Sequence, residues 1–532
     1  MMKKCALRRG ALILTTTLAL PVGLRAQDPP QPGAVAQVSA YRVGTAVPPD
    51  LGRPLVEMSL QDAIDRALER NLDIQTARLA PQMQQYALRS AQAAFTPTLS
   101  GSYGYNNSTR QSTSQLDGGA RTTTERLTFN TSLSQTVPWY GGRMSADFSN
   151  ARTETNNAFT TLNPSYSSTV SLNYTQPLLS GRRTDNQRAA LQSQQIQGQI
   201  TDIQLDALEL TVTDQVRLRY WNLRAAIEQI EIQRRALEQA QQLLAQNELR
   251  VQLGSMAQIQ VVQAQSQVAA AEQALLNAEV QWRNAELALK SILIDGADDP
   301  LLGQTISPTE LPTLSEQAVD IQAALEVALR ERADLRQQRQ ELRITELELD
   351  VTNDQRLPDL NLTAGYSLQG VGGNLFERPE LGGDPILIDR GGYLDGLGSI
   401  ADFDTPTWSL SMNFSYPIGM RGAKASSERA KLQFEQNELA IRSQELAVVT
   451  EVTDAGLAVT DTRLQLAAAQ RSRQLAEESA AATVSRFNAG VATNFEVGEA
   501  NDDLTSARLS ELRALINHIN AIAAFERVQL VG

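Results

Sequence analysis

The chain carries one sequence pattern twice, at a spacing too long for a solenoid repeat. The segment AIDRALERNLDIQ, which begins at Ala63, aligns without a gap with ALEVALRERADLR, which begins at Ala324. The match continues into AAFTPTLSGSYGY and QRLPDLNLTAGYS, where Pro97 stands opposite Pro358. In both copies the apolar spacing changes from a helical period to a strand period after the proline. The sequence therefore predicts two halves with one plan: an amphipathic helix, a set of strands and a long helical hairpin.

The first 26 residues have the composition of a secretory signal peptide. Basic residues precede an apolar run from Ala11 to Leu20, and small residues precede a plausible cleavage site after Ala26. That run is too short for a helix that spans a membrane. We therefore expect a signal peptide at residues 1–26, followed at 27–54 by a proline-rich extension. The single cysteine, Cys5, lies in the signal, so we expect no thiol chemistry in the mature chain.

Composition argues against several classes of function. The formal net charge is −13, and the acidic residues are spread along helical segments, which argues against nucleic acid as a partner. The single histidine, His518, lies in an apolar stripe, where a packing role is expected. The sequence contains no nucleophile elbow, phosphate-binding glycine loop or set of residues with metal-ligand spacing. We therefore predict neither an enzyme nor a protein with a cofactor or a metal.

Two long regions without proline predict exceptionally long helices. No proline occurs between Pro177 and Pro300 or after Pro417, and LGS at 253–255 is the natural place for a reversal. A helix of roughly 65 residues would be about 100 Å long. An apolar stripe with coiled-coil spacing runs along the first of them; it consists of Leu205, Leu208, Val212, Val216, Tyr220, Leu223, Ile227, Ile230, Leu237, Ala240 and Leu244. The helices alone fit a plain coiled coil equally well.

Between the helices, apolar and polar residues alternate with period two. The apolar members are Leu99, Tyr103, Tyr105, Leu127, Phe129, Leu133, Val137, Met144, Ala146, Phe148, Tyr166, Val170, Leu172 and Tyr174 in the first half, and Leu360, Leu362, Ala364, Tyr366, Leu368, Trp408, Leu410, Met412, Phe414 and Tyr416 in the second. Segments of about ten residues with this alternation indicate an outer-membrane β-barrel. A soluble β-sandwich is the alternative, because alternation alone does not distinguish the two.

The connections between these segments set the expected number of strands. PWYGG at 138–142 is short, whereas 111–125, 153–164 and 370–405 are long and polar. Because the helices on either side leave from one side of the membrane, each half needs an even number of strands, and we predict four and then two. Six strands cannot enclose a lumen, since useful barrels need about eight. Several protomers must therefore share one barrel.

At this point the chain resembles the TolC-like outer membrane efflux proteins, over nearly all of the mature sequence. The resemblance is carried by the duplicated plan, by the strand-to-helix passages YTQPLLSGRRTDNQRA and FSYPIGMRGAKASSERA, and by the tips RVQLGSMAQIQVVQAQ and RFNAGVATNFEVGEAN. It implies a mixed α+β homotrimer with an outer-membrane β-barrel continued by a long periplasmic α-helical barrel. The implied function is a passive exit duct that docks to a periplasmic adaptor and an inner-membrane transporter, in an efflux or type I secretion system.

The resemblance also suggests a division of the chain. The expected parts are the signal peptide at 1–26, the extension at 27–54, first helices at 55–97, strands at 98–179, a helical hairpin at 180–294, a linker at 295–317, and then helices at 318–357, strands at 358–418 and a hairpin at 419–532. Family barrels have four strands per protomer, so the additional hairpin from Leu127 to Asn150 leaves twelve or eighteen strands open for the trimer.

Carried over residue by residue, the resemblance assigns two kinds of site to the tips. The adaptor-docking turns would be Leu253, Gly254, Ser255, Ala489, Gly490 and Val491. Glu496 and Glu499 would form an acidic ring at the periplasmic aperture, where three copies would attract cations; a solvated helix face is the alternative. Phe487 and Ala492 replace a tyrosine and an arginine that tie the closed tip in some members, so other contacts must hold it.

A structural function, without transport, remains an alternative. A trimeric coiled coil that tethers the outer membrane to the periplasm without conducting would show the same long helices. Conductance distinguishes a duct from such a tether. The substrate, the adaptor and the pump do not follow from the sequence.

Overall fold

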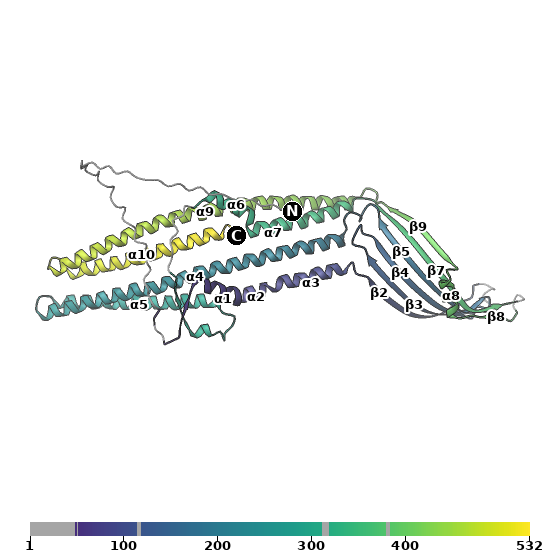
Figure 1. Cartoon of the computed structure of the whole chain (residues 1–532), viewed down its shortest axis with the longest axis horizontal. Helices are drawn as coiled ribbons and strands as arrows, with labels where there is room; N and C mark the ends of the chain where they lie inside the picture. The colour runs from purple at the N-terminus through teal and green to yellow at the C-terminus, as the bar shows by residue number, and fades with distance from the viewer. Residues whose placement is uncertain (1–47, 50–51, 114–118, 311–318, 379–382, 532) are drawn as a thin grey trace, which may run out of the picture. The chain divides into compact units, whose positions relative to one another are not determined.

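The structure, a computed structural model, describes residues 48–49, 52–113, 119–310, 319–378 and 383–531. The expected signal peptide and most of the proline-rich extension lie outside these residues. Figure 1 shows long helices that lead into one curved sheet. The order of elements in the first half, short helices, strands and a long hairpin, recurs in the second half. The chain is therefore mixed α+β, as the sequence predicts.

Short helices open each half. The first half begins with α1 (Leu60–Arg70), α2 (Leu72–Ala77) and α3 (Leu79–Ala93). The second begins with α6 (Ile321–Glu331) and α7 (Ala333–Asp354). Ser59 starts α1, because its hydroxyl accepts a hydrogen bond from the Asp62 backbone N–H at 3.1 Å; the Asp62 carboxylate accepts one from the Ser59 N–H. This capping box satisfies two donors that the first helical turn leaves without partners.

Two long hairpins account for most of the helical residues. The first consists of α4 (Asn186–Gln252, 67 residues) and α5 (Gln258–Leu293), and the second of α9 (Arg421–Asn488, 68 residues) and α10 (Asn494–Arg527). At 1.5 Å per residue α4 and α9 are each about 100 Å long, which confirms the predicted rods, and the tips confirm both reversals. Among the described residues, no helix combines the length and the apolar character needed to cross a membrane.

The predicted stripe on α4 forms the centre of the largest core. Val216, Tyr220, Leu223, Ile227 and Ile230 are all buried there. They pack with buried residues of α1, α5 and α10. Removing these apolar surfaces from water stabilises the packing of the hairpins by about 25 cal/mol per Å². Near the end of the predicted stripe the buried position is shifted by one residue, because Leu243 is buried whereas Leu244, the predicted member, is only half-buried.

The strands form one seven-stranded sheet, in the order β2–β3–β4–β5–β7–β8 with β9 also paired to β7. Their bounds are β2 (Thr98–Gln111), β3 (Arg121–Thr136), β4 (Arg143–Thr155), β5 (Leu162–Pro177), β7 (Asp359–Glu377), β8 (Ile386–Arg390) and β9 (Pro406–Ser415). All neighbours are antiparallel. The hairpin of β3 and β4 thus lies inside the sheet, between β2 and β5.

The register gives the sheet an apolar face and a polar face. Residues directly opposite each other in neighbouring strands lie on one face. One continuous row across six strands reads Leu99, Leu133, Ala146, Leu172, Tyr366 and Trp408. A row on the other face reads Ser100, Ser132, Asp147, Ser171, Ser367 and Thr407. The register therefore places the predicted alternating residues of both halves on a single apolar face.

The connection at 370–405 differs from the long polar loop that the sequence suggests. Strand β7 continues to Glu377, β8 pairs with its far end, and a helix, α8 (Tyr393–Ala401), follows. The second half thus has three strands instead of two, although β8 spans only five residues. Alternation cannot be read in so short a strand, and ILIDR is apolar in three consecutive positions.

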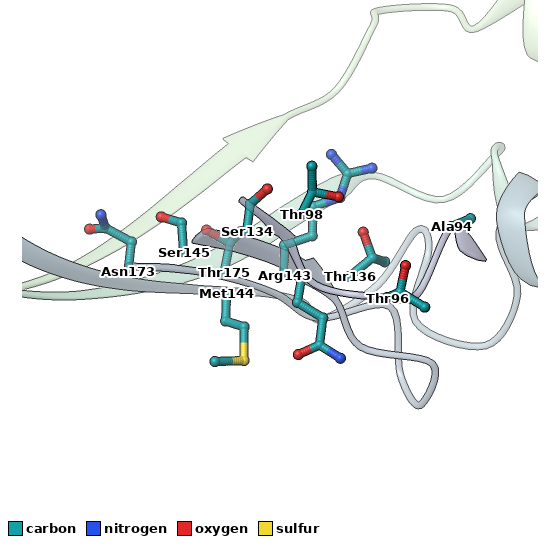
Figure 2. Close-up of a pocket in the computed structure, with 11 residues that line it drawn as sticks. Ala94, Thr96, Thr98, Ser134, Thr136, Arg143, Met144, Ser145, Asn173 and Thr175 are labelled. Atoms are coloured by element: carbon teal, nitrogen blue, oxygen red, sulfur yellow. The ribbon is translucent and has the colours of Figure 1, made fainter. Parts of the chain in front are cut away.

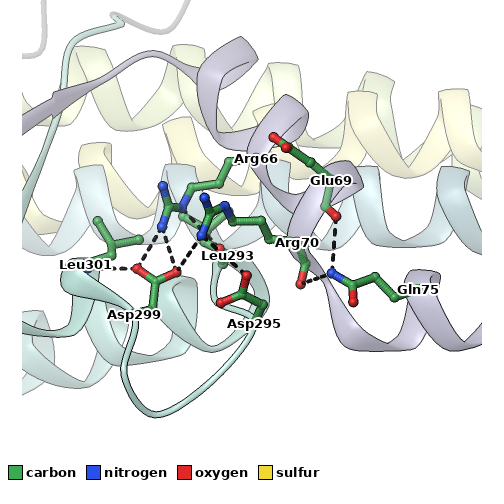
Figure 3. A network of polar contacts seen from close by, with 8 residues as sticks. All are labelled: Arg66, Glu69, Arg70, Gln75, Leu293, Asp295, Asp299 and Leu301. Carbon is green, nitrogen blue, oxygen red and sulfur yellow. Dashed lines mark hydrogen bonds and ion pairs between the residues drawn. The ribbon is translucent and has the colours of Figure 1, made fainter.

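A second, two-stranded sheet joins the start of the described chain to the predicted linker. Strand β1 (Leu55–Met58) pairs in parallel with β6 (Thr305–Pro308). Figure 3 shows the ion pairs beside it, where the Arg66 guanidinium donates to both Asp299 carboxylate oxygens at 2.7 and 2.8 Å. Arg70 lies 3.3 Å from Asp295 and 3.6 Å from Asp299. Although burial alone would raise it, these cations and the Leu301 backbone N–H lower the pKa of Asp299. The linker is thereby fixed to α1.

Candidate functional site

The two hairpin tips are built in the same way. After α4, the Ser255 N–H donates to the Arg250 carbonyl at 2.9 Å and the Gly254 N–H to that of Val251 at 2.9 Å. After α9, the Val491 and Gly490 N–H groups donate in the same pattern. Gly254 and Gly490 have φ of 73° and 76°, the left-handed conformation that ends a helix in a Schellman motif. The alignment of the two tips in sequence is thus matched in backbone geometry.

The helices that return from the tips begin differently. Ala257 precedes α5 and forms no side-chain hydrogen bond to that helix. Thr493 precedes α10, and its hydroxyl accepts a hydrogen bond from the Glu496 N–H at 3.3 Å. In return, the Glu496 carboxylate accepts one from the Thr493 N–H at 2.6 Å. Glu496 therefore completes a capping box at the start of α10. The predicted acidic ring did not include this structural role.

The two predicted aperture carboxylates lie on the first turns of α10. Glu499 is exposed and Glu496 partly exposed. The backbone N–H of Thr493 and then its hydroxyl lower the pKa of Glu496, so this carboxylate stays ionised to a lower pH than usual. Residues three apart on a helix share a face. A single chain brings the two carboxylates to one face, and the ring itself remains a prediction.

The predicted docking turns carry exposed apolar side chains. Leu253 is 72% exposed and Val491 68% exposed. One turn further on, Ile259 and Phe495 occupy equivalent positions and are 59% and 65% exposed. Each tip thus presents two large apolar side chains on a polar helical surround. Exposed apolar groups that cluster within a polar rim mark interaction sites.

The tips contact each other through residues that sequence reasoning did not assign. Phe487 and Val497 of the second tip are buried against Leu243 of the first, with Met256 and Ala492 beside them. The Arg250 guanidinium carbon lies 4.1 Å from the centre of the Phe487 ring, a cation–π contact. Phe487 therefore acts within the chain as an apolar anchor between the tips.

A buried pair of amides lies next to this cluster. The Asn247 Nδ2 donates to the Asn494 Oδ1 at 2.9 Å, and the two residues are 0% and 3% exposed. The other polar atom of each amide has no hydrogen-bond partner among the described residues. Unpaired buried polar atoms are costly. This hydrogen bond therefore adds a buried polar contact between the tips to the apolar cluster and the cation–π contact. The signal in the sequence was Asn247, a polar residue at a position where the apolar stripe of α4 would continue.

Further along the second hairpin, buried ionisable groups join α9 to α10. The Glu511 Oε2 lies 2.6 Å from the Arg473 Nε. Burial raises the pKa of Glu511, and the charge of Arg473 opposes that rise. His518 is buried, and its Nδ1 lies 3.1 Å from the Thr462 hydroxyl. Burial lowers the pKa of His518, which favours the neutral ring. His518 thus has the packing role expected from its stripe.

The polar face of the sheet is hollowed where the strands lead into the helices. The hollow has a volume of about 310 Å³. The residues of β2 to β5 that line it on the polar face are Thr98, Ser134, Thr136, Arg143, Ser145, Asn173 and Thr175. In Figure 2 the Met144 side chain points to the opposite side of the sheet from those of Ser145 and Asn173. This surface suits water and solutes. Among the described residues, no group of His, Cys, Asp or Glu side chains could hold a metal ion.

Solved structures of similar fold are outer-membrane channels. The Campylobacter jejuni CmeC outer membrane channel is 17% identical with a TM-score of 0.62, over 88% of this chain and 85% of that one. The Vibrio cholerae outer membrane protein VceC is 15% identical with a TM-score of 0.60, over 89% and 96%. The open state of the Neisseria gonorrhoeae MtrE outer membrane channel is 18% identical with a TM-score of 0.58, over 89% of each chain.

A comparison with curated proteins gives no match. The model of the outer membrane efflux protein family, by contrast, matches residues 63–293 and 324–527, which together span far more than half of the sequence. Both copies of the repeated pattern, from Ala63 and from Ala324, begin where these matches begin. The two matched ranges contain the sheet and both long hairpins. The chain therefore belongs to the outer membrane efflux protein family and is a TolC-like channel protein of the outer membrane.

Proposed function

We propose that three copies of this chain form a passive exit duct that carries substrates from a periplasmic adaptor and an inner-membrane pump to the exterior. The observation that carries the proposal is the two-faced sheet. Every long strand contributes to the apolar face and to the polar face, as the wall of a transmembrane barrel with an aqueous lumen requires. A polar lumen suits the passage of water and solutes.

The strand edges support closure between copies. Among the described residues, β2 pairs only with β3, and β9 only with β7. Both are long, with 14 and 10 residues, and an open edge is not tolerated in hydrocarbon. If β9 of one copy pairs with β2 of the next, six long strands from each of three copies close a barrel of eighteen. Its diameter would be about 36 Å between backbones, against about 24 Å for twelve strands.

The long hairpins would form the periplasmic wall. In this arrangement α4, α5, α9 and α10 continue the duct below the membrane as a helical barrel. The repeated order of elements supports an internal structural duplication, with halves at 55–294 and 318–532 joined by the linker at 295–317. The further division into barrel strands at 98–179 and 358–418 belongs to the same proposal.

The tips would be the periplasmic end of the duct. Leu253 and Val491 offer an adaptor exposed apolar anchors, set by the turns at Gly254 and Gly490. Ser255 and Ala489 complete the two docking turns. Glu496 and Glu499 would line the aperture, where three copies of each concentrate negative charge and attract cations. Whether the cargo is a small toxic compound or a secreted protein depends on the pump.

Single-channel conductance of the purified mature protein in a planar bilayer tests the proposal. We expect a small, cation-selective, mostly closed channel. The variant with Asn247→Ala and Asn494→Ala, which loosens the tips, should conduct more. If neither protein conducts although both are folded, trimeric and inserted, the non-conducting tether is the better account.

A further inference from the structure

The short helix α8 lies on the apolar face of the sheet. The Tyr393 hydroxyl donates to the Asn150 Oδ1 at 2.9 Å, and the Tyr393 ring meets that of Tyr166 edge-on, with centres 6.2 Å apart. Tyr166 and Asn150 lie on the apolar face, because Asn150 pairs with Phe129 and with Ser168 in the same register as the apolar rows. Figure 1 shows α8 beside β7. The helix therefore covers the side of the sheet that would face lipid.

Glycines permit this contact. A Cβ at Gly370 would overlap the carbonyl oxygen of Gly396, and one at Gly372 would overlap that of Gly392. Gly392 and Gly396 lie four apart, so they present a flat face to the strand. Paired small residues that let backbones approach closely are typical of helix packing in membranes. The contact is thus specific to these glycines and is not a loose loop lying on the sheet.

The position of α8 along the strands is set by the register. The apolar rows on β7 and β9 end with the pair Leu368 and Pro406. Gly370 is the next residue on that face of β7, and it pairs with Ser168, which is only 1% exposed. The helix therefore covers the first small and polar positions beyond the apolar band, on the side away from α4 and α9. This is the level of an outer membrane–water boundary.

The surface that α8 exposes is apolar with polar ends. Leu394 is 77% exposed, and Phe403, just after the helix, is 60% exposed. Asp395 caps the start of the helix, where its carboxylate accepts a hydrogen bond from the Gly392 N–H at 2.6 Å. The exposed Asp402 follows the end of the helix. Apolar side chains between charged ends suit a helix that lies in a membrane interface.

We propose that α8 forms a collar on the outside of the barrel and that this collar lies in the outer leaflet of the membrane, at the polar–apolar boundary. The inference rests on the proposed barrel. Leu394 would enter the acyl boundary, while the charged ends of α8 stay in water. Strand β8 pairs with β7 at Asn374 to Glu377, further toward the exterior than Gly370 and Gly372. The collar is continuous with the apolar band and extends it toward the exterior on this part of the circumference.

Site-directed fluorescence tests the collar, helped by the lack of cysteine after Cys5. A polarity-sensitive probe is attached to Leu394→Cys in the full trimer, reconstituted in vesicles. Quenching by lipid nitroxides near the headgroup is compared with quenching by aqueous iodide. Leu410→Cys and Ser409→Cys serve as matched controls, since these neighbours lie on the apolar and polar faces of β9.

We expect at least twofold stronger quenching of the Leu394 probe by shallow lipid nitroxides than of the Ser409 probe. Quenching by iodide alone would overturn the collar. If both control probes were quenched only by iodide, the barrel proposal itself would fail, so the two failures are distinguishable. Gly370→Ala should displace α8 and weaken lipid quenching at position 394, whereas Gly398→Ala, where a Cβ meets open space, should leave it unchanged. Equal quenching in the two variants would also count against the collar.

Discussion

At the scale of single residues, glycine and carboxylate positions decide how the tips form. A Cβ added at Gly254 or Gly490 would meet no other atom within 4 Å, so the role of these glycines lies in the backbone conformation alone. Gly198, inside α4 but nearer its start than its end, has an ordinary backbone, and a Cβ there would meet only Gln84 at 3.9 Å. The same substitution at these positions should therefore have opposite effects.

We expect Gly254→Ala to destabilise its tip by about 1–2 kcal/mol, because an alanine in the left-handed region is strained. Gly198→Ala should stabilise α4 by about 0.5–1 kcal/mol, since alanine is the better helix former. Hydrogen exchange near each site measures both, as local opening reports local stability. A loss of protection near residue 198 would contradict the second expectation.

Glu496 gives a pH dependence whose sign follows from its capping box. Its pKa in the folded chain lies below the ordinary value of 4.5, so its contribution to stability is present above that value and is lost as the pH falls through the folded pKa. Protection of the first amides of α10 should decline in that acidic range. Glu496→Gln, which keeps an acceptor, should abolish the decline, whereas Glu499→Gln should leave it unchanged.

The same variants distinguish the effect of the Glu496 charge from the effect of its capping hydrogen bonds. Glu496→Gln retains an acceptor for the Thr493 N–H and should keep the tip folded while it removes the charge. With Glu499→Gln it should weaken cation block of the channel severalfold in planar bilayers. If the cation block is unchanged, both residues belong to an ordinary solvated helix face and not to an acidic ring.

At the scale of elements, the contact between the two tips depends on the Asn247–Asn494 hydrogen bond. Asn247→Ala leaves a buried amide without its donor, which should cost about 1–3 kcal/mol. Replacing both residues with leucine, beside Leu243 and Phe487, should recover much of that loss. Protease cleavage at the tips, measured for Asn247→Ala, for Asn494→Ala and for the variant with both changes, gives the coupling energy between the two residues. Additive effects would mean that the pair does not join the tips.

The sequence predicts most elements because their patterns are long. Strands of 10 to 19 residues show alternation clearly, and the rows across them confirm it. The nine-residue α8 contains two glycines within its bounds, so propensity and periodicity both fail to indicate it. Likewise, the aligned tip glycines predict the turns, but contact between Arg250 and Phe487, far apart in sequence, depends on how the hairpins pack. Long-range side-chain contacts leave no local pattern.

At the scale of the whole molecule, the number of strands sets the width of the duct. The hairpin of β3 and β4 pairs with a strand on each side, so in the proposed barrel it would belong to the wall and not to a loop outside it. In a trimer this favours eighteen strands over twelve. The membrane part would then resemble a porin in width, and the tips would be the narrowest part of the path.

Polymer exclusion measures that width. In a channel opened by Asn247→Ala with Asn494→Ala, neutral polymers added on the exterior side should enter the lumen up to a size set by a barrel about 36 Å wide between backbones. Added on the tip side, the same polymers should be excluded at a smaller size. Equal, small cut-offs on both sides would favour a twelve-stranded wall.

The open edges of the sheet also bear on how the protein reaches its membrane. A lone chain would bring the backbone groups of β2 and β9 into hydrocarbon unpaired, at several kcal/mol for each group. If three copies close the proposed barrel, a single copy has no stable inserted state, and insertion and trimerisation would occur as one event. This has a genetic consequence. A variant chain whose β9 cannot pair would still pair through its β2 with normal copies, and it would therefore block assembly in a dominant-negative manner in a cell that makes both chains.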